Sequence, residues 1–174
     1  MLTADNIAIN AIQSAKWAAK KTIRAREVEQ LAAKFPQLTL VSTMNGNGLI
    51  AATKNIRTEL KAAFPGVKFS VTSSRYSGGD SIQVSWTDGP CADRVEAITK
   101  KYQAGSFDGM QDLYTYDDDA FNDAFGDARY VHTTRSYSPK IEQWINEQVA
   151  KHGYNDYWNN PHRIMSQMNI KATK

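Results

Sequence analysis

Cysteine is almost absent from this chain, because Cys91 is its only one in 174 residues. A single cysteine cannot form an internal disulfide, so nothing in the composition indicates an oxidising compartment. A chain of this length can bury roughly two-thirds of the surface that its unfolded form exposes, which supports a core without disulfide or metal cross-links. We therefore predict a single domain that spans residues 1–174.

Long apolar runs are absent too. No stretch approaches the roughly 20 apolar residues that a membrane span requires, and the N-terminal residues show no positive region followed by an apolar run. These absences predict a cytoplasmic protein that makes no contact with a membrane.

The common signatures of catalysis and metal binding are also missing. The three histidines form no recognisable nucleophile signature with Cys91, which we interpret as an ordinary residue at a helix start. Gly78 and Gly79 lack the spacing of phosphate-binding loops and are more typical of a hairpin turn. The aspartates after Tyr116 fail the calcium-loop template, because glycine is missing at its sixth position and no glutamate closes it. We predict no catalytic residue, no metal, no cofactor and no enzymatic activity.

Charge is distributed unevenly along the chain, although the net charge is only +3. Residues 1–35 are basic, whereas residues 101–130 contain seven aspartates and only two cations. This acidic stretch also contains phenylalanines, and a loop that combines negative charge with apolar anchors suits a basic, phosphate-binding groove on a target. A solvated acidic connection is the alternative interpretation. The candidate acidic binding residues are Asp112, Asp117, Asp118, Asp119, Asp123 and Asp127.

Basic and aromatic residues alternate in two other segments, 68–76 and 129–140. On a sheet face such side chains can bind phosphates and stack on bases, as in sheet-based binders of single strands. Aromatic residues also favour strands for structural reasons, and arginine covers sheet edges, so the pattern has a purely structural alternative. The basic helix at residues 16–26 is a competing electrostatic site or a solvated face. The candidate residues of the two alternating segments are Lys68, Arg75, Tyr76, Arg129, Arg135 and Lys140.

The first part of the chain is predicted to be helical. An alanine-rich segment follows Thr3 and runs to Phe35, where Pro36 forbids continuation. A turn signal at residues 45–48 precedes a second helix, which extends from Leu49 to Ala63 and ends before a Pro-Gly pair.

Strand patterns begin after this second helix. Apolar residues alternate over positions 67–71 and again over 82–86, with two glycines in between, and this predicts a hairpin. Asp88-Gly89-Pro90 then opens a third helix that ends before Gly105.

Two more strands are predicted at Leu113–Tyr116 and Arg129–Tyr137, followed by a helix that Ser138 and Pro139 begin. A short last helix from Asn160-Pro161 would use Ile164, Met165 and Met168. We therefore predict an α+β fold: a four-stranded antiparallel sheet with helices packed on one face. Within it, residues 1–45 form a helical extension, 46–137 the core and 138–174 the C-terminal helices.

Three segments carry a family resemblance: FPGVKFSV at residues 64–71, RYSGGDSIQVSWTDGP at 75–90 and GSFDGM at 105–110. With them, the chain from about Ile50 to Tyr137 resembles the large polyvalent protein associated domain 29, a module of long phage and plasmid proteins. Such domains occur beside modules for antirestriction, DNA modification and DNA entry. The resemblance implies a small accessory protein in an infected or recipient bacterial cell, and it supplies no catalytic residues.

We therefore expect a non-enzymatic binding protein of a phage or plasmid that counters host defence, of the antirestriction or anti-CRISPR type. Its expected partner is a host defence protein or nucleoprotein complex in the bacterial cytoplasm. Direct binding of DNA or RNA, in DNA processing or regulation, is the second hypothesis, and an enzyme acting on nucleic acid or nucleotide is the third. A whole-molecule DNA mimic should be strongly acidic, which this chain is not.

Overall fold

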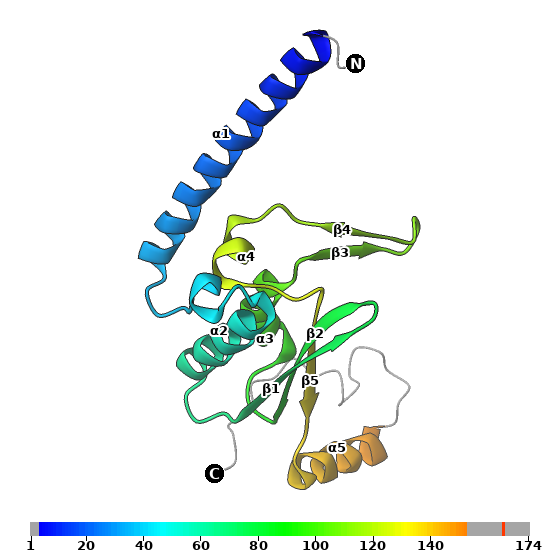
Figure 1. Cartoon of the computed structure of the whole chain (residues 1–174). Helices are drawn as coiled ribbons and strands as arrows, with labels where there is room; N and C mark the ends of the chain where they lie inside the picture. Colours follow the sequence, from blue (N-terminus) through cyan, green and yellow to red (C-terminus); the bar gives the residue numbers. More distant parts are fainter. Residues whose placement is uncertain (1–3, 153–164, 166–174) are drawn as a thin grey trace.

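The N-terminal helix projects from the rest of the molecule (Figure 1). The computed structural model describes residues 4–152 and residue 165. Helix α1 spans Ala4–Lys34, as predicted, and its 31 residues make it about 46 Å long at 1.5 Å per residue. The last turn closes where the Phe35 N–H donates to the carbonyl of Leu31 at 2.9 Å, and Pro36 follows. Only this C-terminal part of α1 packs on the body, chiefly on the short helix α4 (Ala120–Phe125).

The predicted turn before the second helix is confirmed. A single 3₁₀ turn (Val41–Met44) ends in two left-handed residues, Asn45 (φ 52°) and Gly46 (φ 75°). Asn47 then caps helix α2 (Gly48–Ala63), because its Oδ1 accepts the Ile50 N–H at 3.3 Å.

One buried polar side chain ties α2 to two distant segments. The amide of Asn55 is fully buried. Its Oδ1 accepts the Thr39 N–H at 2.6 Å, and its Nδ2 donates to the carbonyls of Thr39 at 2.8 Å and Phe125 at 2.9 Å. The chain after α1 and the end of α4 are therefore fastened to the same residue of α2.

The predicted hairpin is also confirmed. Strands β1 (Phe69–Tyr76) and β2 (Gly79–Thr87) are antiparallel, with Tyr76 opposite Gly79 and Phe69 opposite Trp86. Alternation places Val71, Val84 and Trp86 on the side that α2 covers, and all three are buried. Helix α3 (Ala92–Thr99) and a 3₁₀ turn (Lys100–Tyr102) follow, and α3 packs on the same side.

The predicted four-stranded antiparallel sheet is wrong. Strand β5 (Tyr130–Ser136) pairs with β2 in parallel, which gives a three-stranded mixed sheet in the order β1-β2-β5. The connection from β2 to β5 runs through α3 and α4, and such a long crossover lets β5 run parallel to β2, whereas the short loop of a hairpin does not. Strand β4 (Leu113–Tyr116) joins neither β2 nor β5. It pairs with the unpredicted strand β3 (Gly105–Asp108) in a separate two-stranded hairpin, which projects from the body in Figure 1.

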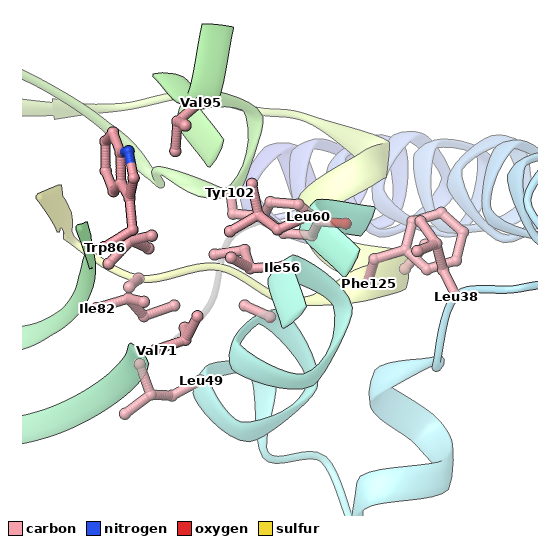
Figure 2. Close-up of a cluster of buried hydrophobic side chains, with 14 residues drawn as sticks. Leu38, Leu49, Ile56, Leu60, Val71, Ile82, Trp86, Val95, Tyr102 and Phe125 are labelled. Atoms are coloured by element: carbon pink, nitrogen blue, oxygen red, sulfur yellow. The ribbon is translucent and has the colours of Figure 1, made fainter. Parts of the chain in front are cut away.

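The core lies between α2, α3, α4 and the covered side of the sheet (Figure 2). Ile56 and Leu60 of α2 are fully buried, and so are Tyr102 and Phe125. Fully burying an apolar side chain of this size stabilises a fold by about 1.5–3 kcal/mol, so this cluster supplies the stability of the body.

The C-terminal helix α5 spans Pro139–His152 and begins as predicted, with the Ser138 carbonyl accepting the N–H groups of Ile141 at 2.9 Å and Glu142 at 3.0 Å. The predicted last helix lies outside the described residues except for Met165, which is helical and buried. Within the ranges that the structure describes, no helix combines the length and the apolarity that crossing a membrane requires.

Candidate functional site

The basic helix and the acidic segment, predicted separately, meet in one place. Lys20 Nζ lies 2.8 Å from Asp118 Oδ2, and the guanidinium of Arg24 also pairs with Asp118. Arg24 Nε lies 3.0 Å from Asp123 Oδ2 in α4. We call this cluster of Lys20, Arg24, Asp118 and Asp123 the junction. It joins segments that are 94 to 99 residues apart in the sequence.

The junction changes the ionisation of its central carboxylate. The hydrogen bond from Lys20, followed by the positive charge of Arg24, lowers the pKa of Asp118 below its ordinary value of 3.8. A carboxyl with a lowered pKa in the folded state contributes stability at neutral pH and loses that contribution as the pH falls through the folded-state pKa. The junction should therefore loosen only in acid.

The remaining acidic candidates are spread over other places. Asp112 occupies the turn between β3 and β4, where its φ is 49°. Asp117 is exposed immediately after β4, and Asp119 caps α4 by accepting the Phe121 N–H at 2.9 Å. Asp127 is half-buried after α4, and burial, followed by repulsion from Asp80 and Asp123, raises its pKa. The six aspartates thus do not form one continuous loop surface.

The phenylalanines of the acidic segment do not serve one common role either. Phe125 is fully buried and Phe121 is half-buried against the core. The ring of Phe35, just after α1, packs edge-on against both, at centroid distances of 5.9 and 6.0 Å. Phe107 in β3 is 52% exposed. Only Phe107 therefore remains available as an apolar contact for another molecule.

Between Ile9 and the junction, α1 is exposed. Every residue from Ile9 to Ile23 is exposed. Trp17, which is 72% exposed, lines a shallow hollow of about 390 Å³ with the neighbouring lysines and Arg24 of the junction. An exposed apolar surface of this kind beside charged residues is typical of an interaction site.

The basic and aromatic candidates divide between the two ends of the three-stranded sheet. Arg75 and Tyr76 end β1, and Arg129 precedes β5 at the same end, where its Nη1 donates to the Gly78 carbonyl. Arg75 donates to Asn47 Oδ1 at 2.8 Å. Lys68 lies at the opposite end and is exposed.

Arg135 is placed differently from the other candidates. It lies at the Lys68 end of the sheet, on the side that the helices cover, and it donates to the carbonyls of Asp88, Gly89 and Met165 at 2.9 to 3.0 Å. Its guanidinium also lies over the ring of Tyr137 at 5.1 Å. These contacts make Arg135 part of the folded framework. Lys140 is exposed in the first turn of α5.

Sequence reasoning missed a row of aromatic rings that crosses from one sheet to the other. Ring centroids are 4.8 Å apart between Tyr116 and Tyr114, 5.6 Å between Tyr114 and Tyr130, and 6.0 Å between Tyr130 and His132. The alternation of Tyr114 with Tyr116, and of Tyr130 with His132, was a signal that each pair shares one face of a strand. The contact between the two pairs depends on long-range packing that the sequence does not show.

No group of three or more metal-ligating side chains comes together among residues 4–152 and 165. The strongest perturbation of a titratable group within that range belongs to Tyr102. Burial, followed by a 2.7 Å hydrogen bond to Glu59, raises the pKa of its hydroxyl well above the ordinary range. Glu59 also pairs with Lys101 at 2.6 Å. These partly buried contacts stabilise the packing of the turn after α3 on α2.

A family model described as large polyvalent protein associated domain 29 matches residues 49–138, just over half of the chain. The chain belongs to this family. Its domain 29 segment begins at Leu49 in α2, runs through β5 and ends at Ser138, so the three-stranded sheet, the β3–β4 hairpin and most of the core cluster lie within the match. Membership of domain 29 associates the protein with the polyvalent proteins of mobile genetic elements.

The match also divides the junction. Asp118 and Asp123 lie within the domain 29 segment, whereas Lys20 and Arg24 lie outside it on α1. No curated protein and no solved structure matches the chain. The family match thus covers the body from α2 to β5 and does not include α1 or α5.

Proposed function

We propose that this protein is a non-enzymatic binding protein through which a mobile genetic element counters a host defence such as restriction or CRISPR interference. Its contact surface is the exposed part of α1 together with the acidic residues that adjoin the junction. Its target is a protein or nucleoprotein complex of the host. Family membership supports the association with mobile elements, and the structure of α1 supports a role in binding.

The exposure of apolar side chains on α1 carries this proposal. Ile9, Ile12, Trp17 and Ile23 are 52%, 57%, 72% and 57% exposed. A surface helix of a globular protein normally turns its apolar residues toward its own core. A helix that projects and exposes them has the form of a segment that lies in a groove of a partner, with apolar residues as anchors.

The charges around these anchors support a nucleoprotein target. Lys16 and Lys21 are exposed on α1, and Asp117 is exposed beside the junction. A protein that holds nucleic acid presents a basic groove and a polyanion side by side. A surface with neighbouring carboxylates and ammonium groups complements both, and such complementarity raises association rates and selects the partner.

The test is protection of phage or plasmid DNA in hosts that carry a defined restriction or CRISPR system. The double variant Ile12→Ala/Trp17→Ala should lose protection by about tenfold or more, because a central anchor residue of an interface typically costs more than a factor of ten in affinity when truncated. Its melting temperature should stay unchanged. Trp144→Ala on α5, where Trp144 is 43% exposed, is the matched control and should protect fully. Full protection by the double variant would rule out α1 as the contact surface. No protection by the unaltered protein against any tested system would contradict the anti-defence function.

Direct binding of nucleic acid is the second candidate function, in DNA processing or regulation of the mobile element. One observation favours it: Arg75, Tyr76 and Arg129 come together at one end of the sheet, next to a sheet face that no described helix covers. Binding of nucleic acid that is weakened by Arg75→Gln would support this candidate.

A further inference from the structure

The three-stranded sheet has one side that the helices α2 and α3 leave uncovered. Its outward positions are the even residues of 70–76, the odd residues of 81–87 and the even residues of 130–136. We call this side the open face. All twelve residues are Ser, Thr, Gln, Tyr or His, so the open face carries no carboxylate. Two carboxylates flank its β2 positions: Asp80 lies on the other side of the strand and accepts the Arg129 N–H at 2.8 Å, and Asp88 follows Thr87 and is buried.

Hydrogen bonds between strands fix the polar side chains of the open face. The hydroxyls of Ser74 and Ser81 lie 3.0 Å apart, and Gln83 Nε2 donates to Thr134 Oγ1 at 2.8 Å. The Gln83 side-chain carbonyl and the serine and threonine hydroxyls keep further hydrogen-bonding capacity. They can hydrogen-bond sugars or base edges without introducing a repulsive charge.

Aromatic rings occupy the end of the open face near the β1–β2 turn. Tyr130 and His132 belong to the open face itself, with their ring planes only 13° apart. The row continues through Tyr114 to Tyr116 in the β3–β4 hairpin, and Tyr116 is 64% exposed. Burial, followed by the neighbouring phenols of Tyr116 and Tyr130, raises the pKa of Tyr114 to about 12, so the Tyr114 hydroxyl is uncharged at neutral pH.

Positive charges stand at both ends of the open face. The Arg129 guanidinium lies 4.7 Å from the ring centroid of Tyr114 and 5.5 Å from that of Tyr130. At the other end, Lys68 lines a hollow of about 690 Å³ with Ser70, Ser85, Ser136 and Asp88, whose buried carboxylate accepts the Ser138 N–H at 2.9 Å. The six steps along β2 from Ser81 to Thr87 place the two ends about 20 Å apart.

We infer that the open face binds single-stranded nucleic acid. Bases stack on Tyr116 and His132, and phosphates contact Arg129 at one end and Lys68 at the other. A single strand can present its bases to such a row, whereas a duplex keeps them stacked within the helix. This inference rests on the second candidate function, and the proposal for α1 does not depend on it.

Fluorescence anisotropy with labelled DNA and RNA strands of about 12 nucleotides, and with a duplex of the same sequence, tests the inference at low salt. His132→Ala and Tyr116→Ala should each weaken single-strand binding by about tenfold, the usual effect of removing one stacking ring. Lys68→Gln should reduce the slope of log affinity against log salt by about 0.7, the value for one phosphate contact with a single strand. The ratio of DNA to RNA affinity shows which strand the face prefers.

Two matched variants serve as controls. Trp144→Ala removes an exposed ring from α5, and Lys54→Gln removes an exposed lysine from α2. Both should bind as the unaltered protein does. Absence of binding at about 10⁻⁴ M protein would overturn both the inference and the second candidate function. Binding that prefers the duplex, or that falls with Trp144→Ala while His132→Ala has no effect, would overturn the inference alone.

Discussion

Helix α1 and the α2–β5 body use apolar side chains in opposite ways. In the body, Ile56, Leu60 and Phe125 are fully buried and pack on one another, whereas Ile9, Ile12 and Ile23 of α1 are more than half exposed. Burial of such a side chain stabilises a fold by about 1.5–3 kcal/mol, and exposure contributes none of this. Folding of this chain therefore explains the apolar residues of the body, whereas Ile9, Ile12 and Ile23 of α1 have no packing role among the residues that the structure describes.

The largest expected effect is the difference in unfolding free energy between two tryptophan-to-alanine substitutions, one in the body and one in α1. Trp86 is 3% exposed and its Nε1 donates to the Pro90 carbonyl at 3.0 Å, whereas Trp17 is 72% exposed. Trp86→Ala should cost about 3–5 kcal/mol of unfolding free energy, because it leaves a cavity and an unpaired carbonyl. Trp17→Ala should change it by less than about 0.5 kcal/mol. Chemical denaturation of the two variants gives both values, and equal losses would mean that α1 is as much part of the core as the sheet is.

A smaller, local effect is expected at the junction. Arg24→Gln should speed hydrogen exchange of the amides in residues 18–26 by about two- to fivefold, the factor that exposed ion pairs usually contribute. Asp112→Asn is the matched control, since Asp112 lies in the hairpin turn and asparagine tolerates its positive φ.

Acid provides an independent test of the same contact. The pKa of Asp118 is lowered in the folded state, so the junction should persist at neutral pH and loosen as the pH falls below about 4. Asp118→Asn should abolish this acid-dependent step in the exchange of α1. An acid-dependent change of equal size in the hydrogen exchange of the Asp118→Asn variant would mean that other carboxylates cause it.

The smallest effect should be a gain in stability. Asp127 is half-buried with a raised pKa, so its ionised form is disfavoured in the folded state and costs stability at neutral pH. Asp127→Asn should raise the melting temperature at pH 7 by about 1–2 °C, and the gain should vanish as the pH falls to where Asp127 is protonated in both states. A lower melting temperature at pH 7 would show that the carboxylate has a stabilising partner.

Local patterns predicted the helices and the β1–β2 hairpin because the determining residues are neighbours in sequence. Proline after Phe35, the turn signal at residues 45–48 and the alternation of positions 82–86 each act within a few residues. Helix α4 was missed because its six residues lie in an acidic run, although Phe121 and Phe125 are one turn apart. Strand β3 was missed because it is four residues long with a single large apolar residue, Phe107.

The sheet partners and the junction could not be predicted in the same way. Antiparallel or parallel pairing of β5 with β2 depends on how the chain between them crosses the body, and local alternation is the same for both. The contact of Lys20 and Arg24 with Asp118 likewise depends on the direction in which α1 leaves the body. Sequence patterns identified both the basic and the acidic segment. Only the fold shows that ion pairs between the two segments neutralise part of the charge of each.

The hydrogen bonds of Asn55 give the molecule a mechanical property. Helix α1 is attached to the body covalently through the segment that contains Thr39 and electrostatically through Asp123 in α4, and Asn55 holds the backbone of Thr39 and of Phe125 at the end of α4. Force applied to the outer end of α1 would act on a lever about 46 Å long, and both the segment after α1 and the end of α4 would transmit that force to the Asn55 amide. A partner that tilts α1 would thereby exert force on α2 and, through α2, on the sheet.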